Sequence, residues 1–192
     1  SGEAVISRQS AQTVMDHIDQ KKYRAILVEV MEDEWRAKID DTLVPVDKND
    51  FSIALNGQPL HFDVIYMMIH GTPGEDGLMQ GYFKMLKLPV TTGDVLNMAL
   101  TFNKFATNAQ LSKLGMTVAK SLMLQEGESI DEEGILSEIG LPCFVKPNEA
   151  GSSLGISKVK KKEELSAAIQ KALEVNDTVM VEAFMDGREV SC

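Results

Sequence analysis

Hydrophobic and polar positions follow two rhythms along the chain, and each rhythm predicts its own kind of element. Residues 5–19 carry apolar side chains at helical spacing, which predicts an amphipathic helix. Residues 24–30 (RAILVEV) and 63–69 (DVIYMMI) are short apolar runs with β-branched side chains, which is typical of strands buried on both faces. Residues 40–60 hold two weaker strand patterns, so the first third of the chain mixes helix and strand.

Two local signals add to this picture. Asn56-Gly57 is a hairpin signal within the weak strand region. The run at 63–69 leads into a glycine-rich segment that starts at His70, and the strand–helix–strand order that follows implies a parallel, doubly wound sheet. Ligands in such sheets bind beyond the carboxyl ends of the strands, which is where we expect His70.

The pattern changes near residue 95, so we expect a domain boundary there. Gly115 is expected to end the first helix after that boundary. The later elements are expected as helices at 92–114, 131–139 and 162–175 and as strands at 116–121, 142–146, 156–160 and 178–183. The chain begins in a loop with no strand before its first helix and stops inside a strand pattern, so we expect a fragment.

Composition narrows the class of protein. The 192 residues are 44% hydrophobic and 25% charged, with a net charge of -10, which disfavours a broad grip on the nucleic acid backbone. The longest apolar run, 64–69, is far shorter than the roughly 18–20 residues of a membrane span. Cys143 and Cys192 form neither a disulfide framework nor a zinc motif, and a cytoplasmic protein is expected. No arginine occurs between residues 37 and 187, so only lysine can supply a phosphate-binding cation there.

The segment from Lys146 to Gly155 (KPNEAGSSLG) has the residues of an anion-binding turn. A lysine ends an apolar strand, and the small residues after it let backbone N–H groups approach a phosphate. It is not a Walker loop, because no Gly-Lys-Ser/Thr opens a helix. By itself the segment is more often an ordinary Gly/Ser hairpin beside a surface lysine.

A second glycine-rich segment, HGTPGEDG, starts at His70. Glu75, five residues on, could orient the histidine ring, although a lone histidine more often has a structural role. Lys104, taken alone, is an ordinary helix-surface lysine. Glu182 closes an apolar strand seven residues before Glu189, and a buried carboxylate there needs a ligand amine or a lysine on the neighbouring strand as its partner.

Taken together, these motifs identify a resemblance to the D-alanine–D-alanine ligase family of ATP-grasp enzymes. The resemblance covers the whole chain in order, and its segments are SGEAVIS, IHGTPGEDGLMQG, LPVTTGDVLNMALTFNK, GLPCFVKPNEAGSSLGISKV and VMVEAFMDGREVSC. It implies an α/β fold with a parallel-sheet, Rossmann-like N-terminal domain (1–95), followed by the first half of an ATP-grasp domain. That half comprises a central subdomain (96–183) and the start of a truncated C-terminal subdomain (184–192).

The resemblance also implies roles for individual residues. Glu3 matches the glutamate that binds the amino group of the first D-alanine, and His70, oriented by Glu75, matches the histidine near its carboxylate. Glu3 and Ser152 are the implied catalytic residues. The implied nucleotide-binding residues are Lys104, Lys146, Ser152, Ser153, Glu182, Ala183, Met185 and Glu189, with Glu182 at the adenine and Glu189 at the ribose.

Two departures from the family pattern concern neighbours of these residues. Asn103 stands where the family often has aspartate before the lysine, so a supporting carboxylate is absent. Ala150 stands where some members carry a charged residue, which removes one loop contact. The lysine and the loop itself match the family.

The function implied is ATP-dependent ligation of two D-alanines through an acyl phosphate, for peptidoglycan precursors, with the fragment inactive alone. ATP and D-alanine are the implied small-molecule partners, Mg²⁺ is expected to bind beyond Cys192, and the complete enzyme is expected to be a homodimer. No nucleic acid or membrane partner is expected. The alternatives are a D-alanine–D-lactate or D-alanine–D-serine ligase, a non-catalytic nucleotide-binding module, and a purely structural α/β protein.

Overall fold

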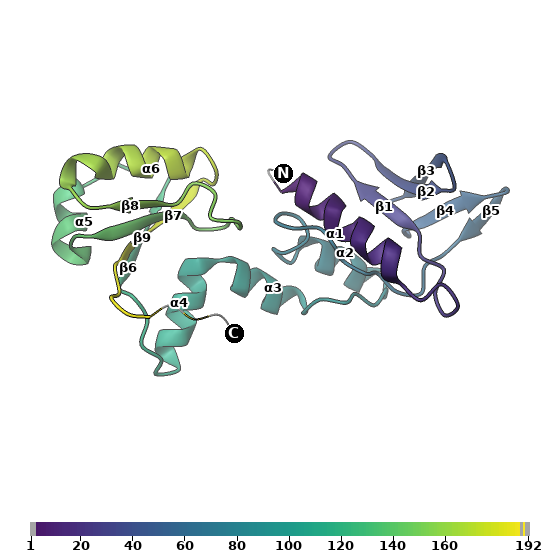
Figure 1. The fold of residues 1–192 in the computed structure, drawn as a ribbon, viewed down its shortest axis with the longest axis horizontal. Coiled ribbons are helices and arrows are strands. Elements are labelled where there is room, and N and C mark those ends of the chain that lie inside the picture. The colour runs from purple at the N-terminus through teal and green to yellow at the C-terminus, as the bar shows by residue number, and fades with distance from the viewer. Residues whose placement is uncertain (1–2, 189, 191–192) are drawn as a thin grey trace. The chain divides into compact units, whose positions relative to one another are not determined.

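The computed structural model describes residues 3–188 and 190. Its contacts divide the chain into two compact units, Ser1–Met98 and Ala99–Cys192, close to the boundary expected near residue 95 (Figure 1). Helix α3 (Val95–Phe102) runs across the division. No helix of the described residues is long and apolar enough to cross a membrane.

The first unit combines two helices with a five-stranded sheet in the order β1-β2-β3-β4-β5. Its elements are α1 (Ala4–His17), β1 (Leu27–Val30), β2 (Trp35–Ile39), β3 (Thr42–Asp47), β4 (Ser52–Leu55), β5 (Gln58–Leu60) and α2 (Leu78–Met85). Asn56 and Gly57 have positive φ angles and form the two-residue turn between β4 and β5, which confirms the predicted hairpin.

The α/β class is confirmed, but the parallel arrangement expected for this sheet is wrong. All its strand pairs are antiparallel, and the expected strand at 63–69 makes one parallel bridge, between Ile65 and Val90. The ladder stops there because the next N–H, that of Met67, donates to the Thr91 hydroxyl at 3.3 Å instead of to a backbone carbonyl. In addition, the hydrophobic pattern did not predict a strand at Trp35–Ile39, where the structure has β2.

Aromatic side chains fill the core of the first unit. Phe51 and Phe83, both almost completely buried, lie edge to face with ring centroids 4.8 Å apart. Trp35 packs edge-on against Tyr82 at 5.2 Å. The antiparallel sheet and α2 therefore share one core.

The second unit is built on an antiparallel four-stranded sheet in the order β6-β9-β7-β8. Its elements are α4 (Lys104–Lys113), β6 (Ser121–Gln125), α5 (Glu132–Ile139), β7 (Cys143–Pro147), β8 (Ser157–Val159), a 3-10 turn (Lys162–Glu164), α6 (Leu165–Leu173) and β9 (Thr178–Ala183). Val145, Val181 and Ile169 are completely buried between the sheet and the helices α5 and α6, which cover one face (Figure 1).

Some element boundaries differ from expectation in this unit. The helix expected over 92–114 is interrupted at Asn103, whose extended backbone (φ -86°, ψ 104°) ends α3 and whose side chain accepts the Ala106 N–H to cap α4. The strand expected at 116–121 begins only at Ser121. Gly115 follows α4 with φ 84°, as predicted for a helix-ending glycine.

Candidate functional site

The face of the second sheet opposite its apolar core carries two charged residues, Lys146 and Glu182. Side chains of β7 and β9 alternate between the core and this face, so Val145 and Val181 point inward while Lys146 and Glu182 point outward. Lys146 and Glu182 are diagonal neighbours on adjacent strands and form an ion pair. Glu182 thus finds its partner in a lysine of the neighbouring strand, one of the two kinds of partner expected for it.

The pair is largely shielded from water. The Lys146 and Glu182 side chains are only 23% and 15% exposed. The other carboxylate oxygen of Glu182 accepts a hydrogen bond from Asn108 Nδ2 of α4 at 3.3 Å. Removing one partner of such a pair leaves the other charge poorly solvated, which makes the pair sensitive to substitution.

Aromatic rings and a second lysine extend this face. Lys158 Nζ of β8 lies 3.7 Å from the ring centroid of Phe184 and 5.5 Å from that of Phe144. Lys146 Nζ lies 5.3 Å from the Phe144 centroid. These contacts hold two ammonium groups beside aromatic rings on this face.

The glycine-serine loop follows β7 directly. Ser152 and Ser153 are exposed and have φ angles of 53° and 57°, in the left-handed region that non-glycine residues rarely occupy. Such conformations turn backbone N–H groups toward one side and recur at ligand-binding loops. Gly155 closes the loop with φ 71°, close against Pro147 and Val175.

Lys104 joins this loop from the start of α4. Its Nζ donates to the Ala150 carbonyl at 2.5 Å and to the Asn148 carbonyl at 3.3 Å. Asn103 Nδ2 donates to Glu149 Oε1 at 2.6 Å beside it. The structure therefore brings Lys104, Lys146 and the loop of Ser152 and Ser153 into one unit.

The remaining predicted nucleotide residues lie at the end of β9. Ala183 is half-buried and its N–H donates to the Lys120 carbonyl at 2.8 Å. Met185 is exposed. Glu189 lies outside the described residues.

His70 is held against α1 in the first unit. Ser10 Oγ lies 3.0 Å from His70 Nε2, and the His70 N–H donates to Ser7 Oγ at 3.0 Å. Ser7 Oγ in turn donates to the carbonyl of Glu3, the residue that directly precedes α1. Glu3, Ser7 and Ser10 follow an i, i+4, i+7 spacing on one helix face, a signal that could have identified both serines from the sequence.

Glu75 differs from its expected role. Its carboxylate accepts the Gly71 N–H at 2.7 Å, whereas the ring of His70 contacts Ser10. The Gly74 and Glu75 N–H groups both donate back to the Gly71 carbonyl, so the segment closes into a tight turn. The expectation that Glu75 orients the imidazole is therefore wrong, because the turn directs the carboxylate to the backbone.

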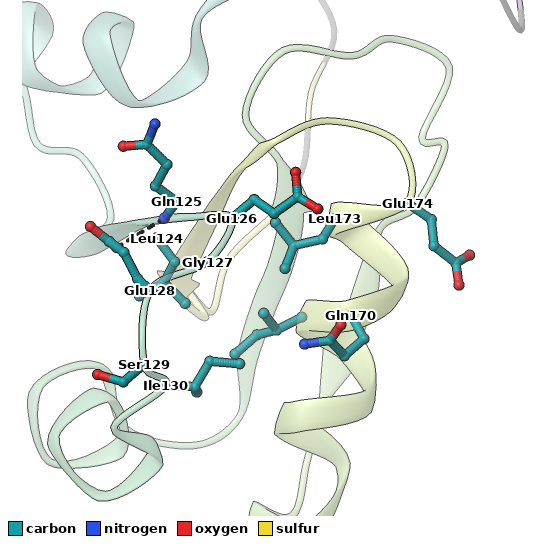
Figure 2. Close-up of a pocket in the computed structure, with 11 residues that line it drawn as sticks. Leu124, Gln125, Glu126, Gly127, Glu128, Ser129, Ile130, Gln170, Leu173 and Glu174 are labelled. Carbon is teal, nitrogen blue, oxygen red and sulfur yellow. Dashed lines mark hydrogen bonds between the residues drawn. The ribbon is translucent and has the colours of Figure 1, made fainter.

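A groove elsewhere in the second unit contains none of the predicted site residues. Figure 2 shows it between the loop after β6 and the end of α6, with Leu124, Ile130 and Leu173 among its lining residues. Glu126, Glu128 and Glu174 also line it, and Glu128 accepts the Gln125 N–H at 3.0 Å. An acidic rim repels phosphate, so this groove does not suit a nucleotide.

No metal-binding cluster occurs in the part of the chain that the structure describes. No group of three His, Cys, Asp or Glu side chains comes together there. The magnesium site stays a prediction.

Comparisons with known proteins agree along the whole chain. Residues 1–93 match the family model described as D-ala D-ala ligase N-terminus, and residues 110–192 match D-ala D-ala ligase C-terminus. The chain is 47% identical to a D-alanine–D-alanine ligase of Phocaeicola vulgatus and 43% identical to one of Bacteroides fragilis, each over 100% of this chain. It spans 60% of the length of both relatives.

Solved structures give the same result. The crystal structure of the VanG D-Ala:D-Ser ligase from Enterococcus faecalis matches 97% of this chain at 31% identity with a TM-score of 0.81, and the match covers 60% of that protein. The D-alanine–D-alanine ligase structure from Coxiella burnetii matches 98% of this chain at 25% identity with a TM-score of 0.84, and the match covers 62% of that protein.

Proposed function

This chain belongs to the D-alanine–D-alanine ligase family, and on that premise we propose that it takes part in the ATP-dependent joining of two D-alanines into D-alanyl-D-alanine. The product would serve peptidoglycan precursor synthesis. D-alanine is favoured over D-serine or D-lactate as second substrate, because the relatives at 43–47% identity are named for D-alanine. The chain spans 60% of those relatives, so the activity proposed is that of the whole protein.

The observation that carries this proposal is the ion pair of Lys146 and Glu182 beside the glycine-serine loop. Lysine offers phosphate a compact positive charge, and phosphoryl transfer depends mainly on positioning and on such charges. We propose that Lys104 and Lys146 bind the phosphates of ATP and that the Ser152-Ser153 backbone covers them. Glu182 would accept from the adenine amine, and Glu189 would bind the ribose.

Substrate binding is proposed for the first unit. The ammonium group of D-alanine needs an anion, which Glu3 supplies, and its carboxylate needs a donor, which His70 supplies. Ser10 and Ser7 support this assignment, because they hold His70 against the helix that Glu3 begins. Glu75 would support the site by closing the turn that follows His70, and not by contacting the His70 ring. Ser152 is proposed to act near the second substrate.

The chemistry is the family's. ATP phosphorylates the carboxylate of one D-alanine, the amine of the second attacks the acyl phosphate, and phosphate leaves. The family implies Mg²⁺, which neutralises phosphate charge when bound. A cytoplasmic location and a homodimer remain part of the proposal.

Nucleotide binding can be tested directly on this chain. Lys146→Ala should weaken binding of a non-hydrolysable ATP analogue by about 1.5–3 kcal/mol in calorimetry, the range for a charge-assisted hydrogen bond. Lys113→Ala, at the other end of α4, is the control and should bind as the wild type does. Unchanged affinity for Lys146→Ala would reduce this lysine to the structural partner of Glu182. In the whole protein, the same change should raise the KM for ATP more than that for D-alanine.

A further inference from the structure

Asn148 connects three segments of the second unit. It follows β7 immediately and is 1% exposed. Its N–H donates to the Thr178 carbonyl at 2.9 Å, which extends the pairing of β7 with β9. Its carbonyl accepts the Lys104 N–H at 3.2 Å, and its side-chain Oδ1 accepts the Phe105 N–H at 2.9 Å. One buried residue thus joins the sheet to the start of α4.

The bonds to α4 have a clear physical purpose. The first N–H groups of a helix lack partners within the helix and must find acceptors elsewhere. The side chain of Asn103, directly before the helix, accepts the N–H of Ala106. The N–H groups of Lys104 and Phe105 instead donate to Asn148, more than forty positions later in the chain. Asn148 therefore ties the start of α4 to the end of β7.

Both predicted phosphate-binding lysines depend on this connection. Lys104 is the first residue of α4, and its Nζ also contacts the Asn148 carbonyl, at 3.3 Å. Lys146 lies two residues before Asn148 on β7, and its partner Glu182 is contacted by Asn108, one turn along α4. A shift of α4 would change the surroundings of both ammonium groups.

The side-chain amide of Asn148 is energetically unfavourable in one respect. Its side-chain Nδ2 is buried and has no hydrogen-bond partner among the described atoms. A buried unpaired donor is destabilising, and leucine, which has nearly the same shape, would avoid that cost. The hydrogen bond that the side-chain amide makes is through its oxygen, which accepts the Phe105 N–H.

We propose that Asn148 is a positioning residue of the nucleotide site, which holds Lys104 in register with Lys146 for binding of the ATP phosphates. The inference rests on the proposed function, because it assigns these lysines to phosphate. Asn148 does not itself touch the nucleotide in this proposal. Its contribution is to limit the positions that the two cations can adopt before the ligand arrives.

The test compares three substitutions in this chain. Asn148→Leu removes the oxygen and the unpaired amide together, so it is expected to fold, and Asn148→Ala is the second variant. Asn176→Ala is the matched control, because Asn176 Oδ1 accepts the N–H of Glu149, the next residue of the same loop, without contacting α4. Circular dichroism checks that each variant is folded.

Two readouts separate positioning from a structural role. In both Asn148 variants, hydrogen exchange of the Phe105 amide, measured by NMR, should become faster. Acetylation of the Lys104 side chain, measured by mass spectrometry, should also become faster, whereas that of Lys113 should not change. Affinity for a non-hydrolysable ATP analogue should fall about 10-fold in both, the effect of losing roughly one hydrogen bond to a charged site. Asn176→Ala should keep the wild-type affinity.

The outcomes distinguish the two proposals. If the wild-type chain fails to bind the analogue, the proposed function is overturned and the inference falls with it. If the wild type binds and Asn148→Leu binds equally well, the inference alone is overturned. The inference is also overturned if Lys104 is acetylated at the wild-type rate in the Asn148 variants, or if Asn176→Ala loses as much affinity as they do.

Discussion

At the scale of single residues, the partner decides what a side chain does. Lys146 could be a surface lysine on its sequence pattern, yet it is three-quarters buried and paired with Glu182. Glu75 could orient a histidine, yet it accepts a backbone N–H. Gly155 is a small residue in a glycine-rich turn, and Pro147 and Val175 leave no room for a side chain there.

Substitution of Gly155 should be more damaging than substitution of another left-handed glycine. Gly155→Ala combines φ 71° with a Cβ only 2.8 Å from Pro147 Cγ. We expect a loss of about 3 kcal/mol in unfolding free energy, from backbone strain and overpacking together. Gly127→Ala, at φ 85° with open space, should lose only about 1 kcal/mol from strain. Urea unfolding measures the free energy of unfolding of both variants. Equal losses would mean that Pro147 and Val175 move aside to accommodate the new methyl group.

At the scale of elements, side-chain oxygens accept backbone N–H groups where helices of the second unit begin. α4 begins against Asn148, which accepts the Phe105 N–H. The turn before α6 is closed by Glu164, whose carboxylate accepts the N–H groups of Lys160 and Lys161 at 2.8 and 3.2 Å. These two bonds favour the ionised form and lower the pKa of Glu164 below its usual value.

This closure should depend on pH. Because the folded state lowers the pKa of Glu164, its stabilising contribution is present above the pKa of an unfolded glutamate and is lost as pH falls through the lower folded value. Glu164→Ala should therefore lower the Tm at pH 7, and the difference from wild type should shrink in acid. Glu163→Ala is the control, and thermal melts from pH 7 to pH 3 are the measurement. A deficit that persists unchanged at pH 3 would contradict the electrostatic explanation.

At the scale of the whole molecule, each compact unit has its own core. Phe83 belongs to the aromatic core of the first unit and Ile169 to the aliphatic core of the second, and both are fully buried. Trp35, the single tryptophan of the chain, packs in the first core only. Its fluorescence is thus a probe of one unit.

The two cores should respond separately to substitution. Phe83→Ala should move the Trp35 fluorescence transition to a lower urea concentration. The unfolding free energy derived from that transition should fall by about 3–5 kcal/mol, the usual cost of removing a buried ring. Ile169→Ala should cost about 2–5 kcal/mol in the second unit but leave the Trp35 transition where it is. Fluorescence and circular dichroism, followed together in urea, make the comparison. A Trp35 transition that moves equally in both variants would contradict separate cores.

Short-range pattern was enough for much of the fold. Asn56-Gly57 forms the predicted hairpin, and the strand at 178–183 occupies the predicted residues. These features depend on neighbours in sequence, namely turn conformation and hydrophobic periodicity. The family resemblance rested equally on local motifs, and the comparisons confirm it.

Contacts between distant segments could be decided only by the tertiary structure. Periodicity did not indicate that the sheet of the first unit is antiparallel, since pairing depends on which strands meet. The pairs Ser10–His70, Phe105–Asn148 and Lys146–Glu182 are 60, 43 and 36 residues apart in sequence. The sequence by itself determined which side chains could bind an anion, and packing decided which of them meet, because local preference does not specify how distant backbone segments close on one another.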